Sequence, residues 1–271
     1  MGRILVVNAD DFGFTRDVNA GIIEAHTRGI LTATTLMANG AAFDDAVRLA
    51  REHPTLDVGC HMVLVQGASL DRPGENLPSS LTQLIRALST RRIDPYTELK
   101  AQAERILHSG LRPLHLDTHK HTHLLPPVLR AVARISREFG IPWVRRPFDI
   151  PVAHANPPLL VRAINFAIGG LRGRFVPTLQ QYGCRTTDHF AGFQLTGRFR
   201  TAELVQLIRN LPEGTTEFMT HPGHCTDELR SMPTRLKESR QVELDALTAP
   251  EVRQQLDRSR VSLCNYRDLS D

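Results

Sequence analysis

Apolar and polar positions follow a repeated order along the chain: a short apolar run, then a longer segment with helical spacing. The apolar runs predict strands at 3–9, 32–38, 57–64, 113–119, 143–146, 215–221 and 261–266. The longer segments predict helices at 16–28, 42–53, 80–90, 95–109, 125–139, 158–171 and 201–211, with further helical stretches within 234–260. Strands that alternate with helices are typical of a parallel sheet with helices outside it.

The number of strand–helix units favours one barrel over two nucleotide-binding halves. Six or seven units within 271 residues suit a single (β/α) barrel. No GxGxxG motif follows a predicted strand, which weakens the dinucleotide-binding alternative. We therefore expect an α/β fold in one domain, residues 1–271. We expect this domain to be a TIM-like (β/α) barrel, which could have seven strands and be imperfectly closed.

Composition narrows the class of protein. Hydrophobic residues make up 41% of the chain and charged residues 23%, which is ordinary for a soluble enzyme. The net charge is only +4, the basic residues are scattered, and aromatic residues make up 6%, which argues against a nucleic-acid partner. The four cysteines form no CxxC pair, and no apolar run reaches the length of a membrane span. The apolar start is too short for a signal peptide, so we expect a cytoplasmic location.

Titratable side chains collect where the predicted strands end. Asp10 and Asp11 end the first strand in "NADDFG", and His61 lies near the end of the third in "GCHMVL". His119 closes the strand in "HLDTHKHTHL", and His221 closes "TTEFMTH". In a parallel barrel the carboxyl ends of the strands meet at one face, where active sites form. Two imidazoles and one carboxylate from different strands make a three-ligand metal site with positions open for water and substrate.

Each of these residues also has a simpler interpretation. Neighbouring strand residues point to opposite sides, so Asp10 and Asp11 share a site only if the chain turns, which Gly13 permits. One carboxylate could then hold a metal while the other acts as general base; alternatively, both cap helix 16–28. His61 could be a core histidine. His221 could precede a turn at Pro222–Gly223 or act as a general acid.

The histidine run is too long for a single ion. In a strand, the side chains on one face would be those of His115, Asp117, His119, His121 and His123. The two ends of that row lie roughly 26 Å apart. Either one or two of these residues are ligands and the rest are supports, or the run is a metal-binding patch without catalysis. Lys120, on the opposite face, is expected to point away from the ligands.

Taken together, the motifs are similar to those of the YdjC-like carbohydrate deacetylases. The order "NADDFG", "GCHMVL", "HLDTHKHTH", "THPGH" carries the resemblance, and "NAGIIEAHTRGILTATTLMANG" and "VSLCNYRDL" extend it over the whole chain. The segments "TTDHFAGF" and "LPEGTTEFMTHPG" resemble the HpnK branch more than the ChbG branch. Lys120 departs from the family pattern, because ChbG has a histidine there.

The resemblance implies a metal-dependent hydrolase that removes acetyl from an N-acetylated sugar. The carried-over metal ligands are Asp11, His61 and His119, with Asp10 as base and His221 as acid. They would hold one divalent ion, with Mg²⁺ and Zn²⁺ both open. The expected substrate is an N-acetylglucosamine unit of an oligosaccharide or a lipid-linked glycoside.

The resemblance also assigns supporting roles. Arg145 resembles an arginine that braces the base in related deacetylases, with the adjacent Arg146 as a competing match. Asp188 in "TTDHFAGF" is assigned to the substrate groove, with Asp117, His121 and His123. A homodimer is left open, since family members can form dimers. The alternatives are a metal-dependent phosphoesterase, which would bind more than one ion, and a sugar-binding barrel without catalysis.

Overall fold

A single parallel sheet forms the centre of the molecule. The computed structural model describes residues 2–151 and 158–269. Seven of its strands follow the order β5-β4-β3-β2-β1-β7-β6, and β8 pairs with β1 beside that path. The strands are β1 (Arg3–Phe12), β2 (Ala33–Leu36), β3 (Asp57–Met62), β4 (His115–Thr118), β5 (Trp143–Val144), β6 (His189–Ala191), β7 (Gly214–Thr220) and β8 (Val261–Leu263).

The sheet curls into a barrel that is weakly joined along one seam. Among the described residues, no ladder joins the edge strands β5 and β6; instead, Trp143 of β5 forms an isolated parallel bridge with Arg185, before β6, and Phe190 of β6 forms one with Asp149, after β5. The α/β barrel with imperfect closure is therefore confirmed. Two details of the expectation are wrong. Strand β6 lies in a segment read as irregular, and the last strand extends β1 without joining the seven-strand path.

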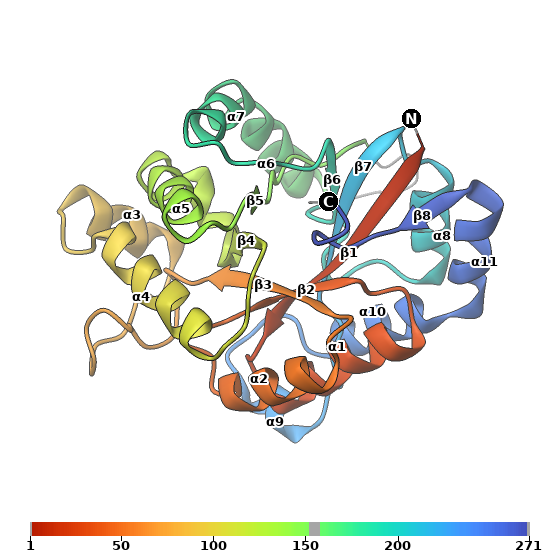
Figure 1. Ribbon diagram of the computed structural model, residues 1–271, viewed down its shortest axis with the longest axis horizontal. Helices are drawn as coiled ribbons and strands as arrows, with labels where there is room; N and C mark the ends of the chain where they lie inside the picture. The colour runs from red at the N-terminus through yellow and green to blue at the C-terminus, as the bar shows by residue number, and fades with distance from the viewer. Residues whose placement is uncertain (1, 152–157, 270–271) are drawn as a thin grey trace.

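Helices lie around the outside of the sheet (Figure 1). They are α1 (Arg16–Arg28), α2 (Phe43–Glu52), α3 (Leu81–Ser89), α4 (Pro95–His108), α5 (Pro126–Phe139), α6 (Leu159–Gly169), α7 (Arg172–Gln181), α8 (Thr201–Arg209), α9 (Asp227–Ser231), α10 (Glu238–Thr248) and α11 (Pro250–Ser259). Sequence spacing did not predict α7 or α9. The N-cap of α1 is Thr15, whose Oγ1 accepts a hydrogen bond from the Val18 N–H, 3.2 Å away. Residues 147–158 are rich in proline, and 152–157 of them lie outside the described residues.

Parallel register determines which side chains meet at the carboxyl ends of the strands. Ala9 of β1 is paired with Thr220 of β7, so the next residues along the two strands, Asp10 and His221, emerge side by side. His61 of β3 is likewise paired with Asp117 of β4. Strand β1 is buried from Leu5 to Phe12, so the acidic pair lies at the buried carboxyl end of this strand.

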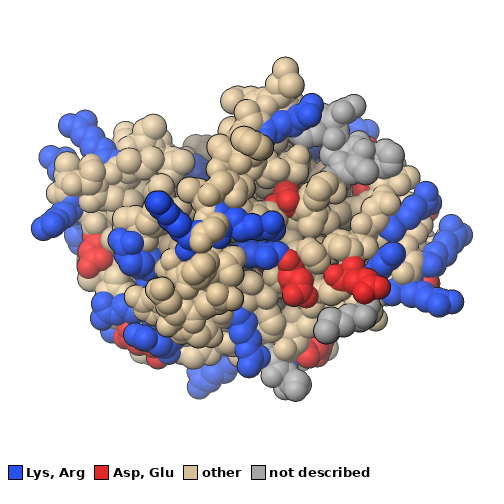
Figure 2. Space-filling view, turned by 90° about the horizontal axis from the view of Figure 1, so that it is seen from above, with Lys and Arg blue, Asp and Glu red and all other residues tan. Residues whose placement is uncertain are grey.

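The described part of the chain has no helix that is both long and apolar enough to cross a membrane. Basic side chains are dispersed over the face shown in Figure 2, and acidic side chains stand among them.

Candidate metal centre and active site

The first strand delivers two adjacent carboxylates to one region. The backbone at Asp11 is left-handed, with a φ of 70°, and the pairing of β1 with β2 shifts register between Ala9 and Phe12. Such a bulge re-aims one side chain out of the alternation of a strand. Asp10 and Asp11 consequently both line the cavity described below. The turn expected at Gly13 begins two residues earlier, at Asp11.

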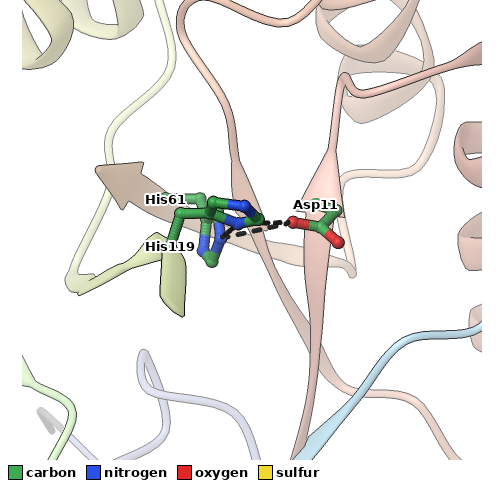
Figure 3. Close-up of side chains that lie close together, drawn as sticks. All are labelled: Asp11, His61 and His119. Carbon is green, nitrogen blue, oxygen red and sulfur yellow. Dashed lines mark hydrogen bonds and ion pairs between the residues drawn. The ribbon is translucent and has the colours of Figure 1, made fainter. Parts of the chain in front are cut away.

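Asp11, His61 and His119 converge from three elements (Figure 3). The Oδ1 atom of Asp11 lies 3.3 Å from Nε2 of His61 and 3.3 Å from Nδ1 of His119, and the two ring nitrogens are 3.2 Å apart. The other carboxylate oxygen, Oδ2, accepts a hydrogen bond from Arg240. The structure thus brings together the three predicted ligands, although they are separated by as much as 108 positions in sequence.

The hydrogen bonds of His61 fix which ring nitrogen faces Asp11. Its Nδ1 lies 2.6 Å from Oδ1 of Asp117, a carboxylate oxygen that can only accept, so Nδ1 donates and Nε2 is the nitrogen left to hold a proton or a metal ion. A carboxylate behind a histidine is the usual support for a metal ligand. Burial alone would lower the pKa of His61, but Asp117, Asp11 and Asp10 outweigh it and raise the pKa to about 10. A cation, whether a proton or a metal ion, is therefore strongly favoured between His61 and Asp11.

The three side chains fit a divalent metal ion. Oδ1 of Asp11 is buried and accepts no hydrogen bond from the described residues, although two ring nitrogens face it. One ligand atom from each residue lies within 4.8 Å of the others. Asp10, His61 and Asp117 form a second such group, but both of its carboxylates already bind the guanidinium of Arg145. The donor set consequently favours one ion.

A buried arginine organises the carboxylates beside this centre. Arg145 donates to both oxygens of Asp10 at 2.7 Å, to Glu217 at 2.7 Å, and lies 2.6 Å from Oδ2 of Asp117. Burial raises the pKa of Asp10, but Arg145 outweighs it and holds the pKa well below its usual value. Arg145 is the arginine that contacts the predicted base, whereas the described structure gives Arg146 no ion pair.

His221 stands on the other side of Asp10. Its Nε2 lies 3.9 Å from Oδ2 of Asp10, and its Nδ1 is buried with no hydrogen-bond partner among the described residues. Burial lowers the pKa of His221 to about 4, so the imidazole is neutral near pH 7. Its backbone N–H donates to the buried carboxylate of Glu243, which also accepts from the N–H of Gly197.

The histidine run does not continue as a strand. Strand β4 ends at Thr118, and a 3-10 helix, η1 (His119–Leu124), follows it, with Lys120 and His121 in left-handed conformation. This turn brings both residues to the cavity, so the expectation that Lys120 points away is wrong. His123 is fully buried and lies 3.1 Å from the carbonyl oxygen of Arg145, so its expected place in the groove is not observed.

The other predicted residues either support the site from behind or lie away from it. Asp117 is buried behind His61 and Arg145, which suits support of the ligands and not contact with substrate. His115 is buried and its ring stacks on Tyr266, which gives it a structural place in the core. Asp188 accepts from the N–H of Thr215 at the beginning of β7, the end of the strand away from His221. The structure therefore does not bring Asp188 to the substrate groove.

A cavity of about 960 Å³ opens over these side chains. It is lined by Asp10, Asp11, His61, His119, Lys120, His121 and His221, together with apolar side chains that include Phe14, Met37, Phe193 and Met219. Lys120, Arg198 and Arg235 also line it, whereas its two aspartates are already paired with arginines. The cavity has room for a ligand larger than one sugar ring. Because its lining keeps basic side chains that form no ion pair in the described structure, and no unpaired aspartate, a neutral or anionic ligand would suit it.

Sequence reasoning missed three buried charged residues of the site. Glu217 holds Arg145, Arg240 holds Asp11, and Glu243 holds the backbone of His221. A signal was present for each of them. Glu217 lies within the apolar strand "TTEFMTH", and Arg240 and Glu243 share the buried stripe of α10 with Leu244 and Leu247. A charge at a core position calls for a buried partner.

The chain is similar to known proteins over nearly its whole length. A family model described as YdjC-like protein matches residues 4–258. A carbohydrate deacetylase from Brevibacillus brevis is 31% identical over 270 residues, covering 98% of this chain and 99% of that protein. One from Geobacillus stearothermophilus is 33% identical over 276 residues, with coverage of 99% and 98%. A crystal structure from Enterococcus faecalis V583, provisionally described as a cellobiose-phosphate cleavage protein, superposes with a TM-score of 0.78 at 24% identity. It covers 99% of both chains.

Proposed function

Because the chain belongs to the YdjC-like family, we propose that it removes the N-acetyl group from an N-acetylated sugar and releases acetate. The observation that carries the proposal is the buried Oδ1 of Asp11, which faces His61 and His119 with no hydrogen bond in the described structure. Asp10 and His221, a base and an acid candidate, stand directly beside it. The two relatives named carbohydrate deacetylase support the same reaction.

A divalent ion held by Asp11, His61 and His119 would polarise the acetyl carbonyl and lower the pKa of an attacking water. Two imidazoles and one carboxylate suit Zn²⁺ by ligand softness, whereas Mg²⁺ prefers oxygen ligands. The donor set thus favours Zn²⁺. Asp117 holds the ring of His61 in the orientation that this role needs.

The remaining residues move the protons. Water adds to the acetyl carbon, the C–N bond breaks, and one proton must pass from the water to the departing sugar nitrogen. Asp10 takes that proton, and Arg145 fixes both of its oxygens in place. His221 is neutral at rest because burial lowers its pKa to about 4, so it must gain a proton before it can donate one. Nε2 of His221 lies 3.9 Å from Oδ2 of Asp10, beyond direct hydrogen-bond distance, so the proton would pass from Asp10 to His221 through a bridging group such as the bound substrate.

The cavity supports a saccharide larger than one ring. Phe14, Phe193 and Met219 offer apolar surface for sugar faces, and Lys120 stands at the open side with its Nζ 2.7 Å from Oε1 of Gln66. An N-acetylglucosamine unit is the proposed reacting sugar, carried by an oligosaccharide or a lipid-linked glycoside. We place the reaction in the cytoplasm, as the cysteine usage suggests.

The two alternative functions receive less support from the site. A phosphoesterase would usually assemble two or three ions, whereas the second donor group here shares His61 and is neutralised by Arg145. A sugar-binding protein without catalysis would need neither Asp10 nor His221.

The test is acetate release by metal-reconstituted protein. N-acetylglucosamine, diacetylchitobiose and an N-acetylglucosaminyl lipid are each incubated with enzyme, and acetate and free amine are quantified. We expect equal amounts of both from at least one substrate, and a large loss in Asp10→Asn with bound metal retained. His119→Ala should lose the metal, whereas His108→Ala, an exposed histidine outside the cavity, is the matched control. Phosphate release from sugar phosphates in place of acetate would contradict the proposal.

A further inference from the structure

Helix α6 carries its large apolar side chains on the outside. None of its residues is buried, and Leu159, Leu160 and Phe166 are 79%, 71% and 87% exposed. Elsewhere in the described chain, large apolar side chains this exposed are lacking; Leu81 and Ile85 of α3 reach only 43% and 47%. Contiguous exposed apolar surface of this kind marks a site of interaction.

The orientation of α6 is the reverse of an ordinary surface helix. Val161, Asn165 and Ile168, spaced by four and three positions, are half-buried and form its inner stripe. Leu159, Ala163 and Phe166 have the same spacing on the opposite face and are exposed. The helix that follows, α7, is anchored by the buried side chains of Phe175 and Leu179. The fold therefore holds α6 in place with its more apolar face in solvent.

The segment that carries this face has charged side chains of one sign only. No Asp or Glu occurs between Asp149 and Asp188, while Arg162, Arg172 and Arg174 are exposed. A second copy packed on the same face by twofold symmetry would bring these arginines against their own counterparts, with no acid from this segment between them. An anionic surface complements both the apolar side chains and the arginines.

We propose that α6 and the beginning of α7 dock the protein on the surface of an anionic lipid bilayer. With 11 residues, α6 is about 16 Å long, far short of the ~30 Å hydrocarbon core, so it lies in the interface. Leu159 and Phe166 enter the acyl boundary, and the arginines contact lipid phosphates. Val161 of the same helix lines the cavity, so docking brings the mouth of the active site to the membrane. The inference does not depend on the proposed deacetylase activity.

The experiment is vesicle co-sedimentation of the full chain. The protein is mixed with vesicles of phosphatidylcholine alone or with phosphatidylglycerol, and the bound fraction gives a partition coefficient. The wild type should bind the phosphatidylglycerol vesicles. Leu159→Ser/Phe166→Ser should lower the coefficient by roughly tenfold or more, because two apolar anchors are lost. Leu81→Ser/Ile85→Ser on α3 is the matched control and should stay within about twofold of wild type.

Three outcomes would overturn the proposal. The wild type fails to bind either vesicle, or the α6 double variant binds as tightly as wild type, which would reduce binding to unspecific charge attraction. In the third, light scattering shows a dimer that dissociates in Leu159→Ser/Phe166→Ser, which would assign the face to a second copy. Both substituted side chains are exposed, so unchanged thermal unfolding confirms that loss of binding is not loss of fold.

Discussion

Replacing Arg145 by Met should destabilise the fold as well as stop the reaction. The guanidinium is buried and contacts the carboxylates of Asp10, Asp117 and Glu217, themselves 3%, 1% and 1% exposed. Without the guanidinium, the three carboxylates remain in a nearly water-free interior, and no other cation contacts all three of them in the described structure. Removing one partner of a buried ion pair typically costs about 3–5 kcal/mol. Here the loss should reach at least the upper part of that range.

The expected change can be stated for thermal unfolding. A chain of 271 residues has an unfolding entropy of about 0.6 kcal/mol/K, so 4 kcal/mol lowers Tm by roughly 7 °C. The loss should be larger at about pH 8 than at about pH 5.5, because the orphaned carboxylates have raised pKa values and bind protons in the native state at the lower pH. Urea unfolding of both proteins at the two pH values measures the loss of unfolding free energy and whether that loss grows or shrinks as pH rises.

Arg146→Met is the matched control, one position away. Arg146 is only half-buried and has no ion pair within the described structure, so its loss should cost about 1 kcal/mol or less. Equal effects of the two substitutions, or an Arg145→Met protein within about 1 kcal/mol of wild type, would refute the reasoning from the buried carboxylates.

Further predictions concern protons and the metal ligands. Metal binding at about pH 7.5 should release about one proton, because the pKa of His61 is raised to about 10. Calorimetry in buffers of different ionisation enthalpy measures the number of protons released, and binding without proton release would contradict the prediction. Asp117→Asn should weaken metal affinity about 10–100-fold in chelator competition, and unchanged affinity would show that His61 needs no support. Burial raises the pKa of Glu243 to about 7, so this group costs stability progressively as pH rises from its unfolded value of 4.5 toward 7. Glu243→Gln should remove that part of the pH dependence of urea midpoints, and identical slopes in both proteins would sink the assignment.

The order of elements and the convergence of the ligands were accessible from sequence. Apolar runs alternating with helical spacing predicted the parallel barrel, and parallel strands necessarily bring their carboxyl ends together. His61 and His119 were placed by that rule before any distance was known. Strand β6 escaped because "HFA" is too short to show a period of two.

What sequence could not give depends on contacts between distant segments. The backbone is left-handed at Asp11 and at Lys120. Lysine ordinarily avoids this conformation, and aspartate adopts it in only a small minority of cases, so residue type alone does not predict it at either position. Arg240 lies 229 positions from Asp11, and only the packing of α10 against the barrel makes them partners. The apolar pattern of α6 reads as a buried helix, whereas its large apolar side chains are in solvent.

The proposed reaction rests on one requirement, a single divalent ion that Asp11, His61 and His119 would hold. Its most direct test is a titration of chelator-treated protein with Zn²⁺, with acetate release measured at each addition. We expect no acetate release from the metal-free protein, and a rate of acetate release that rises with added Zn²⁺ until one ion is bound per chain. Release that is indifferent to metal, or saturation at two ions per chain, would contradict it.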